Sequence, residues 1–294
     1  MCQNFESFTS IGKKRVEVSV ILLLKNNEFY VKKLNELFDP FEKDSKFKFT
    51  YYIYENNSTD KTKESLVEFI KGREGRVILE NMNNPEHFGS VISKERGEFM
   101  SKIRNKLKGL HGTLTSDYTL LIDSDVIFTK EGFDEMLSQI DEENVMVTPF
   151  SVCWKTYQNR KTLHYYDTLA KITDDNISYK ENMNTCMFHD CEHCLRHRKN
   201  HNINIDNKHL LKDNVIKVKC AFAGFCLIKT DIYNKVNWDE TICEHHSFCE
   251  KVREFGNILL LKNVKTVTLD HIEKENEFES VQNFLSLLNK YYIG

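Results

Sequence analysis

The chain has 294 residues, of which 40% are hydrophobic and 12% aromatic, enough to fill the core of one large α/β domain or two small ones. Charged residues make up 29% and the formal net charge is −3, which argues against a disordered chain, a nucleic-acid-binding protein and a polybasic membrane binder. No apolar run approaches the ~18 residues of a transmembrane segment, and the N-terminus lacks the basic-then-apolar order of a signal peptide. We therefore expect a cytoplasmic protein.

The first 150 residues alternate between predicted strands and helices. Strands are expected at 16–24, 49–55, 75–80, 118–122 and 145–150, and helices at 26–38, 62–71, 90–108 and 131–140. The first strand, VEVSVILLL, is almost continuously apolar, which is typical of a strand buried on both faces. Gly109 is expected to end the third helix. The alternation predicts an α/β fold with a mainly parallel central sheet flanked by helices.

The second half is less regular. Its predicted elements are a strand or helix at 162–170, strand-like alternation broken by Gly224 at 216–229, a helix at 245–255, a strand or hairpin at 258–269 and a terminal helix at 278–292. The polar, Cys/His-rich segment 174–213 is predicted to be an insertion. Because no Pro/Gly-rich linker or internal repeat divides the chain, we predict one domain over residues 1–294, with halves at 16–150 and 151–294.

Two carboxylates follow the predicted strand 118–122, in the sequence Asp123-Ser124-Asp125. Hard cations such as Mg²⁺ and Mn²⁺ take oxygen ligands and keep positions open for substrate phosphates. In parallel sheets, ligands bind beyond the carboxyl ends of the strands. The pair is therefore a candidate metal site, and the alternative is a polar turn that only closes the strand.

A second polar cluster, ENNSTD at 55–60, follows the second predicted strand. Ser58, Thr59 and Asp60 are explained by capping of the next helix alone. Capping does not explain Glu55, whose carboxylate could accept hydrogen bonds from a base or a ribose. Both polar clusters thus lie at the edge of the predicted sheet where ligands bind.

Taken in order, these motifs resemble the GT-A glycosyltransferases. The resemblance rests on YENNSTDKT at 54–62, RNKL at 104–107, LIDSDV at 121–126, YDTLA at 166–170, AGF at 223–225, CEH at 243–245 and LDH at 269–271. The order is similar to that of the fungal capsule α-1,3-mannosyltransferase family and, more distantly, of fungal Golgi α-mannosyltransferases. The resemblance implies a Rossmann-like GT-A fold, in which residues 16–150 bind a nucleotide sugar and residues 151–294 bind the acceptor.

On the donor side, the resemblance implies Mn²⁺ or Mg²⁺ bound to the diphosphate of a UDP- or GDP-sugar. Asp125 would be the direct metal ligand, Asp123 would bind the ribose or a metal-bound water, and His271 would complete the metal site. The alternative for His271 is a structural histidine, and for Arg104 it is a solvated helix residue rather than a fork on the diphosphate or base. The implied nucleotide-sugar-binding residues are Glu55, Asn57, Asp60, Arg104, Asp123 and Ser124.

The resemblance implies two catalytic carboxylates, Glu244 on the acceptor side and the metal ligand Asp125. It also implies that Asp167, Gly224 and His245 bind the acceptor. Glu244 would deprotonate the acceptor hydroxyl in an inverting reaction or bind the acceptor in a retaining one. Alternatively, it is only an acid that the helix dipole favours. Because the fungal relatives retain configuration, we expect retention.

The segment 186–201 holds seven Cys and His residues. Four such ligands satisfy tetrahedral Zn²⁺, and we prefer Cys186, Cys191, Cys194 and His197 as a structural zinc site. The alternative is a mobile Cys/His-rich loop over the acceptor cleft.

The motifs together predict a metal-dependent glycosyltransferase that acts on a glycan or glycoprotein acceptor. One alternative is a sugar-phosphate nucleotidyltransferase, which normally has a glycine-rich loop after its first strand, whereas LLLKNNE at 22–28 contains no glycine. The other alternative is a non-catalytic binding module with a zinc-bound insertion.

Overall fold

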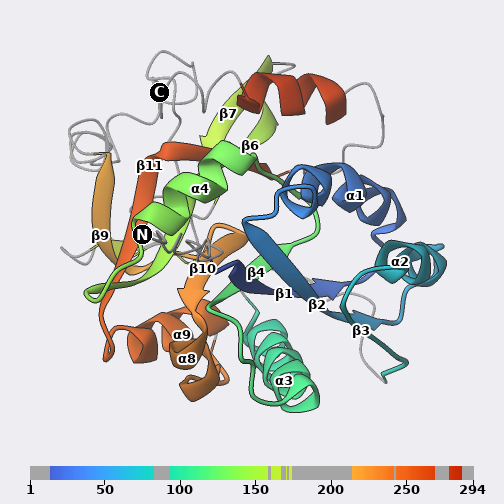
Figure 1. The fold of residues 1–294 in the computed structure, drawn as a ribbon, viewed down its shortest axis with the longest axis horizontal. Coiled ribbons are helices and arrows are strands. Elements are labelled where there is room, and N and C mark those ends of the chain that lie inside the picture. Colours follow the sequence, from blue (N-terminus) through green and yellow to red (C-terminus); the bar gives the residue numbers. More distant parts are fainter. Residues whose placement is uncertain are drawn as a thin grey trace, which may run out of the picture.

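The computed structural model describes residues 14–82, 93–157, 160–166, 170, 172–173, 214–241, 243–268 and 278–286. The predicted insertion, with its four candidate zinc ligands, lies outside the described residues, as do Asp167 and His271. Strands from both halves of the chain join one sheet, and helices cover both of its faces (Figure 1). The predicted α/β class is therefore confirmed.

The sheet has its N-terminal strands at one end and its late strands at the other. Its order is β3 (Gly75–Glu80), β2 (Phe47–Asn56), β1 (Val16–Leu24), β4 (Tyr118–Asp123), β10 (Phe225–Lys229), β6 (Asn144–Tyr157), β11 (Asn257–Thr268), β9 (Val215–Cys220) and β8 (Ile172–Thr173). Off this path, β5 (Val126–Ile127) pairs with β11 and β7 (Arg160–Tyr165) pairs with β6.

Strand directions make the sheet mixed. Strand β1 is parallel to β2 and β4, β2 is parallel to β3, and β6 is parallel to β11. Strand β10 is antiparallel to both of its neighbours, β4 and β6, so it interrupts an otherwise parallel centre. The mainly parallel prediction thus holds for the strands of the first half, and the reversed β10 brings the turn before it to the end of β4.

Burial on both faces explains the sequence of β1. Val18, Val20 and Leu22 are fully buried on one face of the strand, and Ser19 and Ile21 are 2% and 5% exposed on the other, because helices pack on either side of it. One face is covered by α1 (Glu28–Glu42), α2 (Thr62–Ile70) and α4 (Lys130–Ser138), and the other by α3 (Lys94–His111), α8 (Thr230–Lys235) and α9 (Glu244–Val252) (Figure 1). Edge-to-face ring contacts such as Phe41–Phe133, with centroids 5.3 Å apart, join α1 to α4.

Several boundaries differ from the sequence prediction. Helix α3 passes through Gly109 and ends at His111, and the next residue, Gly112, has a φ of 72°, which favours glycine. The ambiguous segment 162–170 contains strand β7, and the segment 258–269 forms the single strand β11. Residues 278–286 are helical, as predicted for the start of the terminal helix.

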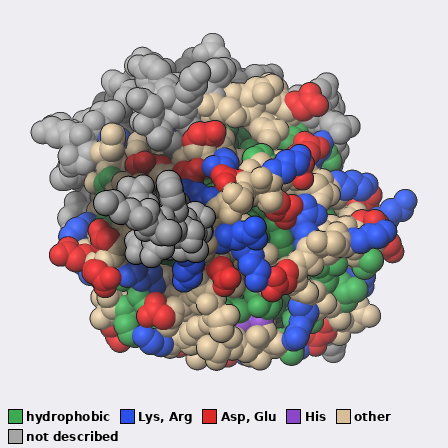
Figure 2. Space-filling model, in the orientation of Figure 1, with side chains coloured by type: hydrophobic (Ala, Val, Ile, Leu, Met, Phe, Trp, Pro, Cys, Tyr) green, Lys and Arg blue, Asp and Glu red, His purple; other side chains and the backbone are tan. Residues whose placement is uncertain are grey.

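Acidic and basic side chains are interspersed over the described part of the face in Figure 2. This mixture fits the small net charge of −3. Among the described helices, none combines the length and apolar character needed to cross a membrane.

Candidate active site

A cavity of about 400 Å³ opens at the carboxyl ends of β1 and β4. Helices α3 and α9, the turn between β9 and β10, and residues 166 and 170 after β7 supply most of the rest of its wall. The described residues that line it are Leu23, Asn27, Arg96, Met100, Arg104, Asp123, Ser124, Asp125, Tyr166, Ala170, Phe222, Gly224, Cys243, Glu244 and His245. Seven of the residues that the sequence singled out are thus brought together: Arg104, Asp123, Ser124, Asp125, Gly224, Glu244 and His245.

The D-S-D segment is held by its neighbours on both sides. Strand β4 ends at Asp123, whose backbone N–H donates to the carbonyl of Gly224 at 2.8 Å. The next residue, Ser124, donates its hydroxyl to Oδ1 of Asn27 at 2.9 Å. Asn27 precedes α1, so the first βα connection and the β9–β10 turn together fix the start of this loop.

Burial raises the pKa of the Asp123 carboxyl, while the positive charges of Arg104 and Arg96 act in the opposite direction. Asp123 is half-buried and lines the cavity, so its carboxylate is open to a cation that enters there. Asp123 and Asp125 offer the oxygen donors that Mn²⁺ and Mg²⁺ prefer. Within the described ranges, no three His, Cys, Asp or Glu side chains are grouped around a common metal position.

Gly224 packs directly against the metal candidate. Its φ is +64°, and a Cβ at this position would lie 3.1 Å from Oδ2 of Asp123 and 3.1 Å from Cγ2 of Val126. The preceding Ala223 also has a positive φ of 60°. This tight turn therefore shapes the wall beside Asp123, in the position where the sequence predicts an acceptor contact.

A buried ion pair joins α3 to α9. Nε of Arg104 lies 3.3 Å from Oε1 of Glu244, and the two side chains are 8% and 3% exposed. The guanidinium carbon lies 5.2 Å from the ring centroid of Phe222 and 5.9 Å from that of Trp238. Arg104 is thus a buried partner of Glu244, rather than the solvated helix residue of the alternative hypothesis.

Glu244 and His245 differ in charge: the carboxylate is negative and the imidazole is neutral. Burial acts to raise the pKa of Glu244, but His245 and Arg104 outweigh it and lower the pKa, which keeps the carboxylate ionised. Burial lowers the pKa of His245, so its imidazole is neutral. The imidazole stacks on the ring of Phe222 with centroids 3.8 Å apart, and its Nε2 lies 3.4 Å from Oε1 of Glu244.

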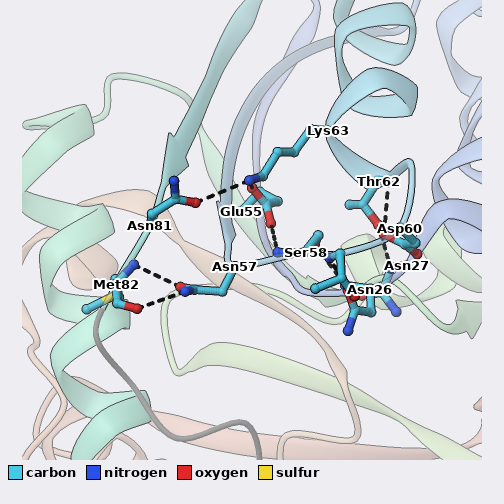
Figure 3. Close-up of polar contacts among 11 residues, drawn as sticks. Asn26, Asn27, Glu55, Asn57, Ser58, Asp60, Thr62, Lys63, Asn81 and Met82 are labelled. Carbon is cyan, nitrogen blue, oxygen red and sulfur yellow. Dashed lines mark hydrogen bonds and ion pairs between the residues drawn. The ribbon is translucent and has the colours of Figure 1, made fainter.

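The second polar cluster does not line the described cavity, and Figure 3 shows how its side chains are used. The amide of Asn57 exchanges two hydrogen bonds with the backbone of Met82, at 2.8 and 2.9 Å. Asp60 accepts from the backbone N–H of Glu28 at 3.1 Å and of Thr62 at 3.0 Å. These contacts tie the loop after β2 to the starts of α1 and α2 and to the end of β3.

Glu55 is the fully buried member of this loop. Its Oε1 accepts from the backbone N–H of Ser58 at 2.6 Å, and its Oε2 lies 3.9 Å from Nζ of Lys63 (Figure 3). No side chain among the described residues hydrogen-bonds to Oε2. Glu55 therefore keeps an acceptor atom that capping does not use, as its sequence position suggests.

Sequence reasoning missed Asn27, Arg96 and Phe222 in the cavity wall. Asn27 could have been found because it follows a buried strand that ends at the ligand-binding edge. Arg96 stands eight residues before Arg104, and two helical residues at this spacing share a face. Phe222 carries no signal in the sequence that separates it from a core residue.

The fold and the paired aspartates at the end of β4 define the GT-A class of α/β proteins. Residues 19–203, more than half of the chain, match the sequence profile of glycosyl transferase family 2, and the chain belongs to this family. The sequence prediction of a glycosyltransferase is confirmed at the level of the family. The comparisons support no particular subfamily, so the likeness to fungal mannosyltransferases stays a prediction.

Among solved structures, the chain is similar to GalNAc-T7 crystallised with UDP, GalNAc and Mn²⁺, with a TM-score of 0.51 and 13% identity over 89% of this chain and 45% of that one. It thus spans less than half the length of GalNAc-T7. The structure of TarS residues 1–349 from S. aureus has a TM-score of 0.46 and 15% identity, over 93% of this chain and 65% of TarS 1–349. The mannosyltransferase PcManGT from Pyrobaculum calidifontis, in complex with GDP-Man and Mn²⁺, has a TM-score of 0.45 and 10% identity. The match covers 94% of this chain and 65% of PcManGT. The first of these likenesses supports the fold. No curated protein matches the sequence.

Proposed function

We propose that the chain transfers a sugar from a UDP- or GDP-sugar to a hydroxyl of a glycan or glycoprotein acceptor, with Mn²⁺ or Mg²⁺ as cofactor. The observation that carries the proposal is the pair of half-buried carboxylates of Asp123 and Asp125, in one cavity with the Arg104–Glu244 pair. Membership of glycosyl transferase family 2 supports the reaction class. The UDP and Mn²⁺ in the structure of GalNAc-T7 support the choice of a uridine nucleotide and of manganese.

Four charged residues of the cavity have proposed roles. Asp123 and Asp125 hold the cation, which supplies charge neutralisation for the departing nucleoside diphosphate. Glu244 accepts a hydrogen bond from the acceptor hydroxyl and orients it. Arg104 is a positioning residue, because it holds the Glu244 carboxylate from the opposite wall. Outside the described cavity, Glu55 contacts the nucleotide, whereas Asn57 and Asp60 act by shaping the loop that carries Glu55.

Three further roles stay predictions from the resemblance, since the residues lie outside the described part of the chain. These are His271 as a metal ligand, Asp167 as an acceptor contact, and the zinc site of Cys186, Cys191, Cys194 and His197. Zinc analysis of protein purified without chelator tests the last of them, and about one equivalent is expected.

Stereochemistry is where the expectations differ, because the fungal relatives retain configuration and members of this family typically invert it. An inverting reaction needs a base that takes the proton of the acceptor hydroxyl, and the ionised Glu244 carboxylate could accept it. We propose retention because the motifs resemble those of retaining enzymes, with the departing phosphate taking the proton. Anomeric NMR of the product tests this part, and an inverted product would contradict it.

A donor screen tests the proposed function as a whole. Hydrolysis of UDP-, GDP- and TDP-sugars should be measured with Mn²⁺, with the Asp125→Asn variant as control. We expect the wild type to cleave at least one UDP- or GDP-sugar and the variant to be inactive. A sugar-phosphate nucleotidyltransferase would instead release pyrophosphate from a nucleoside triphosphate and a sugar phosphate, and a binding module would do neither.

A further inference from the structure

Helix α3 presents one face to the cavity. Arg96, Met100 and Arg104 all line it, at a spacing of four residues. The two arginines of this face differ in their partners. The charge of Arg104 is matched by Glu244 in the buried pair described above, so Arg104 has no net charge to offer to an anionic substrate.

Arg96 differs from the lysines of α3 in that its side chain has no ion-pair partner among the described residues. The lysines of the helix have partners: Lys94 with Glu98, Lys102 with Glu240, Lys106 with Glu80, and Lys108 with the carbonyl of Val236. Over the described ranges, the guanidinium of Arg96 forms no ion pair within 4.0 Å and no hydrogen bond, and only its backbone N–H is used, by Ser93. A half-buried guanidinium without a partner is costly unless a ligand completes it.

Once the other charges of the cavity are balanced, the positive charge of Arg96 remains to bind an anion. A divalent cation balances Asp123 and Asp125, and Arg104 balances Glu244. A nucleoside diphosphate sugar then brings about two negative charges into the same space. The planar guanidinium fork matches two phosphate oxygens. The charge of Arg96 also acts to lower the pKa of both Asp123 and Glu244, so its guanidinium is within electrostatic reach of both carboxylates.

We propose that Arg96 binds the diphosphate of the nucleotide-sugar donor and stabilises it as a leaving group. The inference rests on the proposed function and adds to it a donor-binding residue outside the motifs that carry the family resemblance. The guanidinium of Arg96 would bind an anionic oxygen group, and either the donor diphosphate or an acidic acceptor could supply one. The experiment therefore separates donor from acceptor.

The test is calorimetric titration of the full chain with UDP, UMP, GDP and GMP in the presence of Mn²⁺. In the wild type we expect the diphosphate to bind more tightly than the monophosphate of the same nucleoside. Arg96→Met should weaken diphosphate binding by roughly 10- to 100-fold, the range for one charge-assisted contact, and reduce the preference for diphosphate over monophosphate. Arg96→Lys should give an intermediate affinity, because it keeps the charge without the fork.

Lys102→Met is the matched control, because Lys102 is 62% exposed on the same helix and pairs with Glu240. It removes one positive charge from α3 and should leave nucleotide affinity unchanged. Since Arg96 lacks a partner in the described structure, Arg96→Met should melt at or above the wild-type temperature. The conservative Arg96→Lys keeps the test valid if the methionine variant does not fold.

The outcomes are distinct. Equal diphosphate affinity in the wild type and in both Arg96 variants would overturn the inference while the proposed function stands. Unchanged nucleotide affinity with a raised acceptor KM would assign Arg96 to an acidic acceptor and also overturn it. If the wild type binds neither UDP nor GDP with Mn²⁺, the proposed function fails and the inference falls with it.

Discussion

At the scale of single residues, Glu244 shows how surroundings decide chemistry. A glutamate at the first position of a helix is common, and the dipole alone would explain it. In this chain the carboxylate is 3% exposed and paired with a buried guanidinium. Exposed helix-terminal acids have no such partner, so the contact with Arg104 separates a site residue from a capping acid.

Replacing Glu244 by glutamine tests that role. In the proposed retaining reaction, Glu244→Gln should chiefly raise the acceptor KM and lower kcat less than ~10-fold, whereas loss of a general base costs on the order of 10²–10⁴ in kcat. Steady-state kinetics against acceptor concentration measure the difference. Glu240→Gln is the control, because Glu240 is 51% exposed and pairs with a surface lysine. Unchanged kinetics in Glu244→Gln would remove the residue from the site.

His245 predicts a dependence of stability on pH. Its folded pKa lies below the unfolded value of 6.5 because of burial. The unfolded chain therefore takes up the proton first, and stability is lost as the pH falls below about 6.5. Between pH 7 and pH 5, we expect the wild type to lose up to about 2 kcal/mol more free energy of unfolding than His245→Phe, which keeps the ring stacking. Urea unfolding at the two pH values measures this difference, and equal losses would show that His245 does not titrate as described.

At the scale of elements, the cavity exists because three connections converge on the end of β4. The βα connection after β1 supplies Asn27, the turn before β10 supplies Gly224, and the start of α9 supplies Glu244. Two hydrogen bonds, from Ser124 to Asn27 and from Asp123 to Gly224, link the first two of these connections to the D-S-D segment. The aspartates thus depend on contacts with distant parts of the chain.

Gly224→Ala tests this dependence. The alanine would have to adopt a φ of +64° and approach Asp123 Oδ2 and Val126 Cγ2 to 3.1 Å. We expect a loss of about 1–2 kcal/mol of stability from the backbone conformation and weaker Mn²⁺-dependent nucleotide binding from the displaced Asp123.

The matched control is Gly109→Ala, because Gly109 lies inside α3 with no atom within 4 Å of an added Cβ. This variant should be more stable by about 0.5–1 kcal/mol. Thermal unfolding and calorimetry of both variants measure the effects. Wild-type nucleotide affinity in Gly224→Ala would show that the turn does not position Asp123.

The order of strands and helices in the first half was predictable, because periodicity and strand-end polar clusters are local features of the sequence. The reversal of β10 was not, since nothing within 225–229 shows which neighbours the strand joins or in which direction. The same limit applies to Arg104. Its motif indicated a functional residue, but its partner Glu244 lies 140 residues away and only the packing of α3 on α9 brings the two together.

At the scale of the whole molecule, one sheet combines strands of the first half, where we propose that the donor binds, with elements of the second half, where we propose that the acceptor binds. β10 pairs with β4 in register from Phe225 opposite Ile122 to Lys229 opposite Tyr118. This pairing fixes the proposed metal side and the proposed acceptor side within one cavity. The central claim is therefore that the cavity binds a nucleoside diphosphate through a divalent cation held by Asp125 and Asp123.

Calorimetric titration of UDP and GDP, with and without Mn²⁺, into the wild type and Asp125→Asn tests this claim most directly. We predict that one nucleotide binds the wild type only when Mn²⁺ is present, and that Asp125→Asn loses this binding while its melting temperature stays near that of the wild type. Binding that does not require the metal, or a folded Asp125→Asn variant with wild-type affinity, would contradict the assignment of the D-S-D segment as the metal site.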